Sequence, residues 1–233
     1  SVQDADINAA LDTGTSIQLV TSDGGVNFDD ARISTSSPLA LTFTVNSESS
    51  ITGGTFDIES TGGSLAMDFN ADADGDDPGE GFIAFLGANL SSNGGDIRFF
   101  GGSDPLAGAA TGYGSGIRLN RVAIDTAGGD VLLRGASTGA DTGPDDAGVA
   151  LEFSSIDTDG GDVVVEGTGA GDTGGVFLWS GRIDASGGGG TGAITITGAS
   201  AAAFNAVDLD GFGLLADAGA ISLQGDAGAD GTG

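Results

Sequence analysis

The sequence predicts an all-β fold, a parallel β-helix (β-solenoid) of about seven coils with variable corner loops. Two stretches of the same length and layout, 116–135 and 148–167, each hold two alternating apolar runs joined by a Gly-Gly turn. Gly supplies 46 of the 233 residues and Pro only 4. Because 39% of the residues are hydrophobic, these glycines indicate turns between regular elements and not a disordered chain.

The charge of the chain limits its partners. Asp and Glu number 34 against 6 basic residues, all of them Arg, which gives a formal charge of -28. Such a surface repels phosphate backbones and anionic lipids, so we expect no nucleic acid partner and no direct membrane insertion, whereas divalent cations are suitable partners. The absence of Cys and His excludes disulfides, thiolate metal sites and imidazole catalysis.

The leading segment, 1–24, allows two interpretations. Asp4 can cap a short helical turn that ends at Gly14, and a strand over the same residues is an equally simple alternative. A strand through Ile17 and Leu19 follows in either case.

From residue 25 the chain repeats in register. In each unit one apolar residue, here called the anchor, directly precedes a turn of small residues. The residues seven and five positions before each anchor are almost all apolar. Their spacing of two residues is the period of a strand with one buried face. The anchors are Ile33, Ile58, Leu90, Ile124, Ile156 and Ile183, and the residues seven positions earlier are Val26, Ile51, Ile83, Ile117, Val149 and Val176.

A second alternating run follows each turn. Its predicted inward residues are Leu39 and Leu41, Leu65 and Met67, Ile97 and Phe99, Val131 and Leu133, Val163 and Val165, and Ile194 and Ile196. A seventh unit is predicted with Ala202, Phe204 and Leu209 in its first run and Ile221 and Leu223 in its last.

The spacing between anchors indicates how the chain is organised. It varies from 25 residues (33 to 58) to 34 residues (90 to 124), which suits coils with loops of different length at one corner. The expected loops are 71–80, 102–115, 136–147 and 168–174. We therefore expect one domain over 1–233, with coils over 25–225 and a loop over 226–233 that leads to a further coil of a longer protein.

The sharpest local motif is acidic. Asn70, Asp72 and Asp74 offer oxygen ligands at alternate positions before Gly75, and Asp76, Asp77 and Glu80 can complete a calcium site, although the twelfth position of an EF-hand loop is here Gly81. The alternative is a solvated acidic loop. The calcium candidates are Asn70, Asp72, Asp74, Asp76 and Glu80.

Two columns of aspartates recur beside the turns. Stacking brings Asp96, Asp130 and Asp162 to about 5 Å from one another. We expect each carboxylate to accept backbone N–H bonds within its own turn, with a shared cation as the alternative. The same expectation holds for Asp125, Asp157 and Asp184.

The outward face of the first strand carries the predicted partner surface. Phe177 and Trp179 are expected to face away from the core, near Glu152 and Asn120, where they can stack on a sugar ring or contact a partner. The alternative is that loop 168–174 or a neighbouring domain covers them. Arg121 occupies the position of Phe153 one coil earlier, which indicates an inward side chain or a local bulge. We expect an acidic partner for Arg121.

The segment ADINAALDTGTSIQLVTSDG, followed by coils of the form I-D-T-x-G-G-D-V, resembles the filamentous haemagglutinin-like exoproteins, large surface adhesins exported by two-partner secretion in Gram-negative bacteria. This resemblance covers most of the chain. It implies a right-handed parallel β-helix, secretion to the cell surface, and an adhesive or structural role.

The sequence therefore predicts a non-catalytic rod at the outer cell surface or outside the cell. Its expected partners are a glycan or protein on a host or neighbouring cell, or further copies of itself end to end. One alternative is the subunit of a self-assembling fibre or sheath. A β-helix polysaccharide lyase or hydrolase is the other, and it would need convergent carboxylates, whereas the Asp pairs here lack accompanying basic residues.

Overall fold

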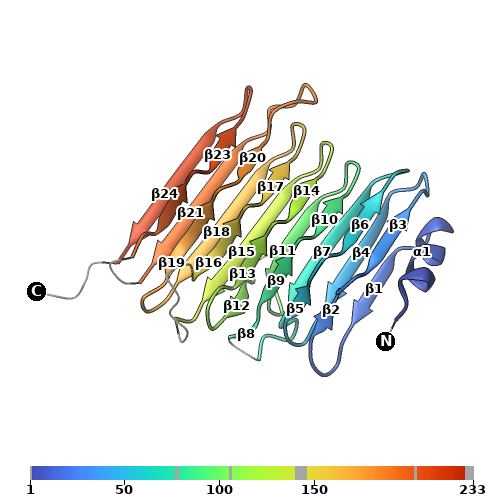
Figure 1. Ribbon diagram of the computed structural model, residues 1–233, viewed down its shortest axis with the longest axis horizontal. Helices are drawn as coiled ribbons and strands as arrows, with labels where there is room; N and C mark the ends of the chain where they lie inside the picture. Colours follow the sequence, from blue (N-terminus) through green and yellow to red (C-terminus); the bar gives the residue numbers. More distant parts are fainter. Residues whose placement is uncertain (1, 77–78, 105–106, 140–145, 202–203, 229–233) are drawn as a thin grey trace, which may run out of the picture.

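The computed structural model describes residues 2–76, 79–104, 107–139, 146–201 and 204–228. The chain winds into a stack of coils whose strands form three sheets running the length of the stack (Figure 1). All strand pairs along these three paths are parallel, which confirms the predicted β-solenoid.

Each coil contributes one strand to each sheet. Sheet A has the order β1 (Ile17–Val20), β4 (Leu41–Asn46), β7 (Leu65–Ala71), β11 (Ile97–Gly101), β15 (Val131–Ser137), β18 (Val163–Gly169), β21 (Ile194–Ser200) and β24 (Ile221–Ala227). Sheet B has the order β2 (Val26–Asn27), β5 (Ile51–Gly53), β9 (Ile83–Leu86), β13 (Ile117–Asn120), β16 (Ala147–Glu152), β19 (Gly174–Trp179) and β22 (Val207–Asp210). Sheet C has the order β3 (Arg32–Thr35), β6 (Asp57–Ser60), β10 (Asn89–Ser91), β14 (Ala123–Asp125), β17 (Ser155–Asp157), β20 (Arg182–Asp184) and β23 (Gly213–Leu215).

The predicted register of sheets B and C is confirmed, and that of sheet A is wrong at its start. Val26 pairs with Ile51, and the column continues through the predicted residues to Val176. In sheet A, however, Leu41 pairs with Leu65 and Phe43 with Met67, while Leu39 is exposed. The prediction was two residues out here and again between β7 and β11, where Ile97 pairs with Met67 and not with Leu65, because a strand pattern of period two is unchanged by such a shift.

Three Gly-Gly turns, at 94–95, 128–129 and 160–161, use their two glycines differently. The first, such as Gly128, has a φ of +108°, and the residue before it, Ala127, is also left-handed at +50°. The second, Gly129, lies against the preceding coil, where a Cβ would stand 2.3 Å from the carbonyl oxygen of Gly95. Positive φ therefore explains only the first glycine, and close approach of backbones explains the second.

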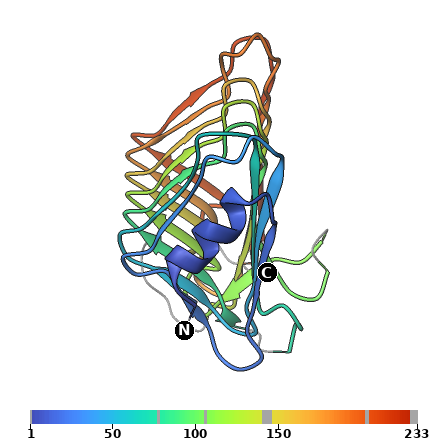
Figure 2. The same ribbon diagram turned by 90° about the vertical axis from the view of Figure 1, so that its right-hand side faces the viewer.

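Helix α1 (Asp4–Asp12) covers the N-terminal end of the stack (Figure 2). The helical interpretation of this segment is confirmed, but its N-cap is Gln3 and not Asp4. The helix buries Ile7 and Leu11. In the described part of the chain, no helix is long and apolar enough to span a membrane.

The side chains of α1 also occupy the free edge of β3. The Asn8 amide donates to the carbonyl of Arg32 and accepts from the N–H of Ser34, both at 2.9 Å. Asp12 Oδ1 accepts from the N–H of Ser36 at 2.9 Å. These side chains supply the hydrogen bonds that an earlier coil would otherwise provide.

Phenylalanines fill the interior of the N-terminal half. Phe69 and Phe99 stack at 5.0 Å between ring centroids, and Phe56 meets Phe85 edge to face at 4.8 Å. From β15 onward the interior columns are aliphatic instead, for example Val131, Val163 and Ile194. The rod therefore has a continuous apolar core that changes in composition along its length.

The last described coil is open on its outer side. β24 is exposed along its whole length, and Ile221 and Leu223 are about half exposed. The predicted seventh unit is right for Leu209, Ile221 and Leu223, which continue the columns. Phe204 is exposed outside β22, and Ala202 lies outside the described residues.

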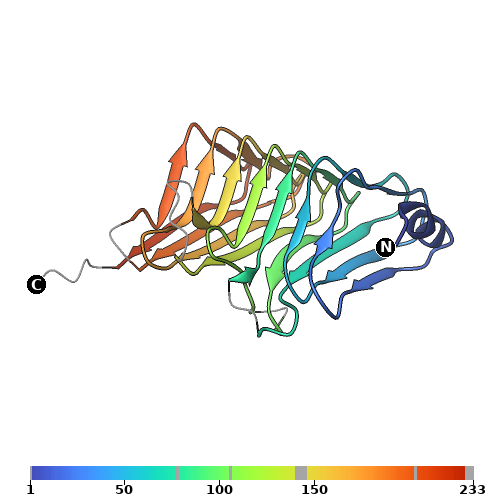
Figure 3. The same ribbon diagram turned by 60° about the horizontal axis from the view of Figure 1, so that its bottom comes forward.

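The predicted loops contain more regular structure than expected. β8 (Glu80–Gly81) and β12 (Ala110–Gly112) form an antiparallel pair, and β12 also extends sheet A beside β15. Figure 3 shows this region projecting from the side of the stack. The loops at 71–80 and 102–115 are thereby held together at one corner.

Candidate functional site

The acidic motif folds into a compact corner directly after β7. One carboxylate oxygen from each of Asp72, Asp74 and Asp76 lies within 4.8 Å of the other two. Asp72 has a left-handed φ of +50°, its carbonyl accepts from the N–H of Gly75 at 3.0 Å, and its Oδ1 accepts from the N–H of Asp76 at 3.1 Å. This tight turn brings alternate carboxylates to one side of the chain.

The neighbouring β8 holds Asp72 in place. A Cβ at Gly81 would stand 2.2 Å from the Cβ of Asp72, so only glycine allows this contact. Asp72 is buried, whereas Asp74 and Asp76 are exposed. Three carboxylates at this separation repel one another, and a hard divalent cation with oxygen ligands relieves that repulsion.

The other two calcium candidates lie apart from this trio. Glu80 is on β8, is exposed, and does not belong to the group of mutually close carboxylates. Asn70 is 7% exposed; its Nδ2 donates to Asn46 Oδ1 at 3.4 Å, while its own Oδ1 is buried with no hydrogen-bond partner among the described residues. Asp77 lies outside the described residues. The structure thus brings together three of the five predicted ligands.

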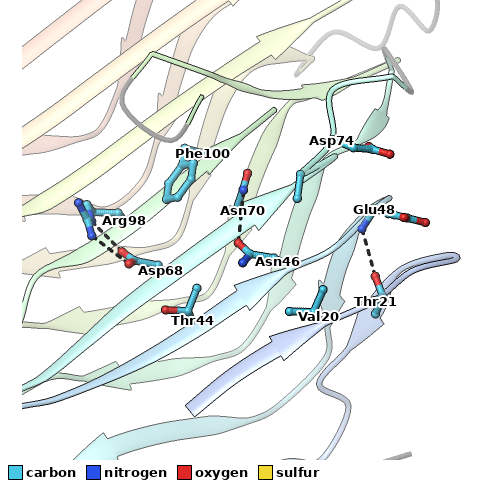
Figure 4. A pocket seen from close by; sticks show the side chains of 11 residues that line it. Val20, Thr21, Thr44, Asn46, Glu48, Asp68, Asn70, Asp74, Arg98 and Phe100 are labelled. Atoms are coloured by element: carbon cyan, nitrogen blue, oxygen red, sulfur yellow. Dashed lines mark hydrogen bonds and ion pairs between the residues drawn. The ribbon is translucent and has the colours of Figure 1, made fainter. Parts of the chain in front are cut away.

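A groove of about 600 Å³ on the outer face of sheet A adjoins the acidic corner (Figure 4). Asn70 and Asp74 both line it. On its other side Arg98 forms a two-pronged ion pair with Asp68, at 2.7 and 2.9 Å, and these hydrogen bonds raise the pKa of Arg98 above its ordinary value. The groove is therefore polar and bordered by both signs of charge.

The aspartate column beside the turns binds backbone in the next coil. Asp96 Oδ1 accepts from the N–H of Asp130 at 3.0 Å, and Asp130 Oδ1 accepts from the N–H of Asp162 at 2.8 Å. Asp162 does the same for Ala193 at 2.8 Å. The expectation of backbone acceptance is confirmed, but the expectation that each bond stays within its own turn is wrong, because the side chains point along the stack.

The second aspartate column behaves as predicted at two of its positions. Asp125 Oδ1 accepts from the N–H of Ala127 at 3.2 Å, and Asp184 Oδ1 accepts from the N–H of Ser186 at 3.0 Å. The hydroxyl and the N–H of Ser186 lower the pKa of Asp184. Asp157 instead pairs with Arg182 of the next coil at 3.4 Å.

The predicted partner surface lies on the outer side of sheet B. Trp179 is 36% exposed and meets the ring of Phe153, which is 42% exposed, at a centroid distance of 4.5 Å. Phe177 points outward but is half-buried. Loop 168–174 therefore leaves part of Trp179 open to solvent.

The polar members of this surface form a network beside the aromatic pair. Asn120 Nδ2 donates to Glu152 Oε2 at 2.7 Å, and Arg118 Nη2 lies 2.7 Å from Glu152 Oε1. Arg121 Nη1 donates to Asn120 Oδ1 at 2.9 Å, and its guanidinium carbon lies 5.3 Å from the Phe153 ring centroid. Among the described residues no carboxylate pairs with Arg121, so the acidic partner expected for it is not found there. Glu152 was expected on the exposed face, but this network leaves it only 4% exposed.

The sequence interpretation missed Arg121 and Phe153 as surface partners. Both residues have a left-handed φ, +55° and +51°, at the corner after β13 and β16. Both side chains are exposed, so the inward alternative for Arg121 is wrong. The corresponding corners after β9 and β22 carry Gly87 and Gly211, which are also left-handed. That alignment with glycine is the signal that identifies the corner.

Comparison of the chain with models of protein families, with curated proteins and with solved structures gave no match.

Proposed function

We propose that the chain is a non-catalytic extracellular rod that acts at an outer cell surface as a structural and adhesive element, as its resemblance to filamentous haemagglutinin-like exoproteins implies. The supporting observation is the contrast between the two sides of its sheets. The inward columns stay apolar from coil to coil, whereas the outward column of sheet B changes from Thr52 to Arg118 to Phe177. A repeated interior supplies stiffness, and a varied exterior supplies recognition.

The stiffness of the rod comes from contacts between adjacent coils. Backbone hydrogen bonds, the aspartate column and inter-coil ion pairs all cross from one coil to the next. Five of the six arginines take part in such ion pairs: Arg32 with Asp57, Arg98 with Asp68, Arg118 with Glu152, Arg134 with Glu166, and Arg182 with Asp157. Exposed pairs each contribute little to stability, about 0–1 kcal/mol, so the apolar core and the backbone ladders dominate.

Calcium is proposed as a stabilising ligand of the acidic corner. Asp72, Asp74 and Asp76 would supply carboxylate oxygens, which are the ligands that Ca²⁺ prefers. Binding there would fasten the segment after β7 to β8, because Asp72 packs against Gly81. The proposed role is structural, and no chemistry is assigned to the ion.

Adhesion is tested with beads that carry the purified protein. Beads coated with the intact chain should bind to bacterial or host cells several-fold more than beads coated with an unrelated acidic protein of similar charge, which controls for nonspecific electrostatics. Labelling of intact producing cells with an antibody should place the chain outside the cell. Equal binding of the two kinds of bead, or a chain found only inside cells, would contradict the proposal.

A self-assembling fibre is the second candidate, and the open C-terminal coil favours it. Ile221 and Leu223 are exposed on β24, whose outer edge pairs with no strand of the described part of the chain, and such an edge can pair with another chain. Both ends of the stack are acidic, with Asp4 and Asp6 at one and Asp226 at the other. Light scattering should therefore show fibres only at high ionic strength or with calcium, and a monomer under all these conditions would exclude this candidate.

A further inference from the structure

We propose that the outer corner of sheet B binds a short glycan whose terminal sugar carries a single carboxylate, such as a uronic acid. The binding patch consists of Arg121, Phe153, Trp179 and Asp210. The inference deepens the proposed adhesive function and rests on it, because it assigns a class of ligand to the varied outer face.

The cation of the patch has no acidic partner in the described part of the chain. The other five arginines each pair with a carboxylate of an adjacent coil. Arg121 instead donates to the amide oxygen of Asn120 and lies over the Phe153 ring. In a chain of charge -28, an exposed guanidinium that no described carboxylate neutralises is available to a carboxylate of a ligand.

A buried carboxylate positions this cation. Glu152 is 4% exposed and accepts from Asn120 Nδ2 at 2.7 Å, so the amide oxygen of Asn120 must face Arg121. Arg118 neutralises Glu152 from the other side, with 2.7 Å between Nη2 and Oε1. The guanidinium of Arg121 is thus oriented before a ligand arrives, which reduces the entropy that binding must overcome.

The aromatic pair beside Arg121 offers an apolar face of the size of a sugar ring. Phe153 and Trp179 come from successive coils, and their rings are 4.5 Å apart and tilted by 56°. Both stay more than one-third exposed. Exposed aromatic rings with one wet side bind amphipathic partners, and the carbon-bound hydrogens of a pyranose give such a partner its apolar face.

The next coil limits the charge of the ligand. Asp210 of β22 lies beside Trp179 in the ladder, and Asp208 lies beside Phe177. Asp210 can accept hydrogen bonds from sugar hydroxyls, whereas it repels a second negative charge. Along the stack, the cation therefore comes first, the aromatic pair second and the carboxylate third. These groups span three strand spacings, or about 14 Å. This length suits one or two sugar units with one acidic group, and the carboxylate disfavours a polyanion.

The groove on the other side of Arg118 gives room for a longer chain. It has a volume of about 400 Å³ and is lined by small residues such as Thr52, Gly54 and Ala84, together with Leu86, Asn120, Arg118 and the carboxylate of Asp29. It crosses sheet B along the axis of the stack. A linear oligosaccharide anchored at Arg121 can therefore continue along the rod.

The fluorescence of Trp179, the one tryptophan of the chain, reports on the patch. The protein is titrated with a disaccharide that ends in glucuronic acid and with the same disaccharide ending in glucose. We expect saturable quenching or a spectral shift with the acidic sugar, and about ten-fold weaker binding of the neutral one. R121Q should weaken the acidic sugar about ten-fold and remove the preference, while R182Q, which removes another exposed arginine, should leave both affinities unchanged.

Several results would overturn the assignment. These are an absence of saturable binding, equal affinity for the acidic and neutral sugars, an equal effect of R121Q and R182Q, or tighter binding of a heparin-like polyanion or of a glutamate-rich peptide. Circular dichroism confirms that both variants are folded. If beads coated with R121Q adhere to cells as well as the parent does, the ligand assignment fails while the adhesive rod stands; if parent beads do not adhere, the proposed function fails.

Discussion

Asp130 Oδ1 accepts a hydrogen bond of 2.8 Å from the backbone N–H of Asp162, one coil further along the stack. The same relationship links Asp96 to Asp130 and Asp162 to Ala193. Each carboxylate in this column is thus separated from the next by a backbone amide that it binds. The column couples adjacent coils through these hydrogen bonds, in spite of its like charges.

Removal of one carboxylate from this column should weaken the stack. D130A leaves the N–H of Asp162 without its acceptor, and we expect a loss of about 1 kcal/mol in the free energy of unfolding. D130N keeps an acceptor oxygen and should lose less. Urea denaturation measures both, with the exposed D23A as a control for the change in net charge. A rise in stability for D130A would show that repulsion between the carboxylates outweighs the hydrogen bond.

The close contact between Gly129 and Gly95 should make the second turn glycine irreplaceable. A Cβ at residue 129 would lie 2.3 Å from the carbonyl oxygen of Gly95, so G129A must push two coils apart, at a cost of about 3 kcal/mol. G211A is the control, because its site has a φ of +62° and open space around it, and it should cost about 1 kcal/mol. Thermal unfolding compares the two, and equal losses would contradict a steric cause.

The amide of Asn8 should protect the N-terminal edge of the stack. N8A removes both hydrogen bonds to β3, and we expect the unfolding free energy to fall by about 1–2 kcal/mol. Alanine is the better helix former, so the loss cannot come from α1 itself. Hydrogen exchange should show faster exchange at Ser34. D6A, on the same helix, is the control and should leave the exchange of Ser34 unchanged.

Calcium should raise the melting temperature of the protein at millimolar concentration. The expected cause is neutralisation of Asp72, Asp74 and Asp76, whose carboxylates lie within 4.8 Å of one another. D74N should abolish most of the rise, whereas D23N, with the same change in charge, should retain it. Scanning calorimetry is done in constant ionic strength with Mg²⁺ as a second control. The same melting temperature in calcium and in chelator would contradict the proposal that the acidic corner binds calcium.

The lowered pKa of Asp184 fixes the sign of its contribution to the pH dependence of folding stability. Its folded-state pKa is lowered by the hydroxyl and N–H of Ser186, so its contribution to stability is fully present above the unfolded pKa of about 3.9 and is lost as the pH falls through the lower folded value. S186A should return the pKa of Asp184 toward its ordinary value. A carbon-detected NMR titration of the carboxyl group measures this shift. An unchanged titration would show that the N–H alone lowers the pKa.

The sequence predicted the fold class because its apolar residues recur at a period of two in successive units. Ile33, Ile58 and Leu90 were placed correctly in one column, since each stands before a turn that marks its position. Leu39 was placed wrongly because the turn before it, Ser36-Ser37-Pro38, lacks the Gly-Gly pair that marks the later turns. A strand moved by two residues presents the same pattern, and only the pairing of Phe43 with Met67 distinguishes the two registers.

The candidate sites could be predicted only in part, for a related reason. Asp72, Asp74 and Asp76 are close in the sequence, so a local turn brings them together and the motif reveals them. Arg121 and Phe153 are 32 residues apart, and their contact depends on the register between coils and on two left-handed corners. The sequence by itself determined a stacked all-β rod with an acidic corner. The tertiary structure decided which outward side chains meet, because those contacts form between coils and follow from backbone dihedrals that the apolar pattern does not encode.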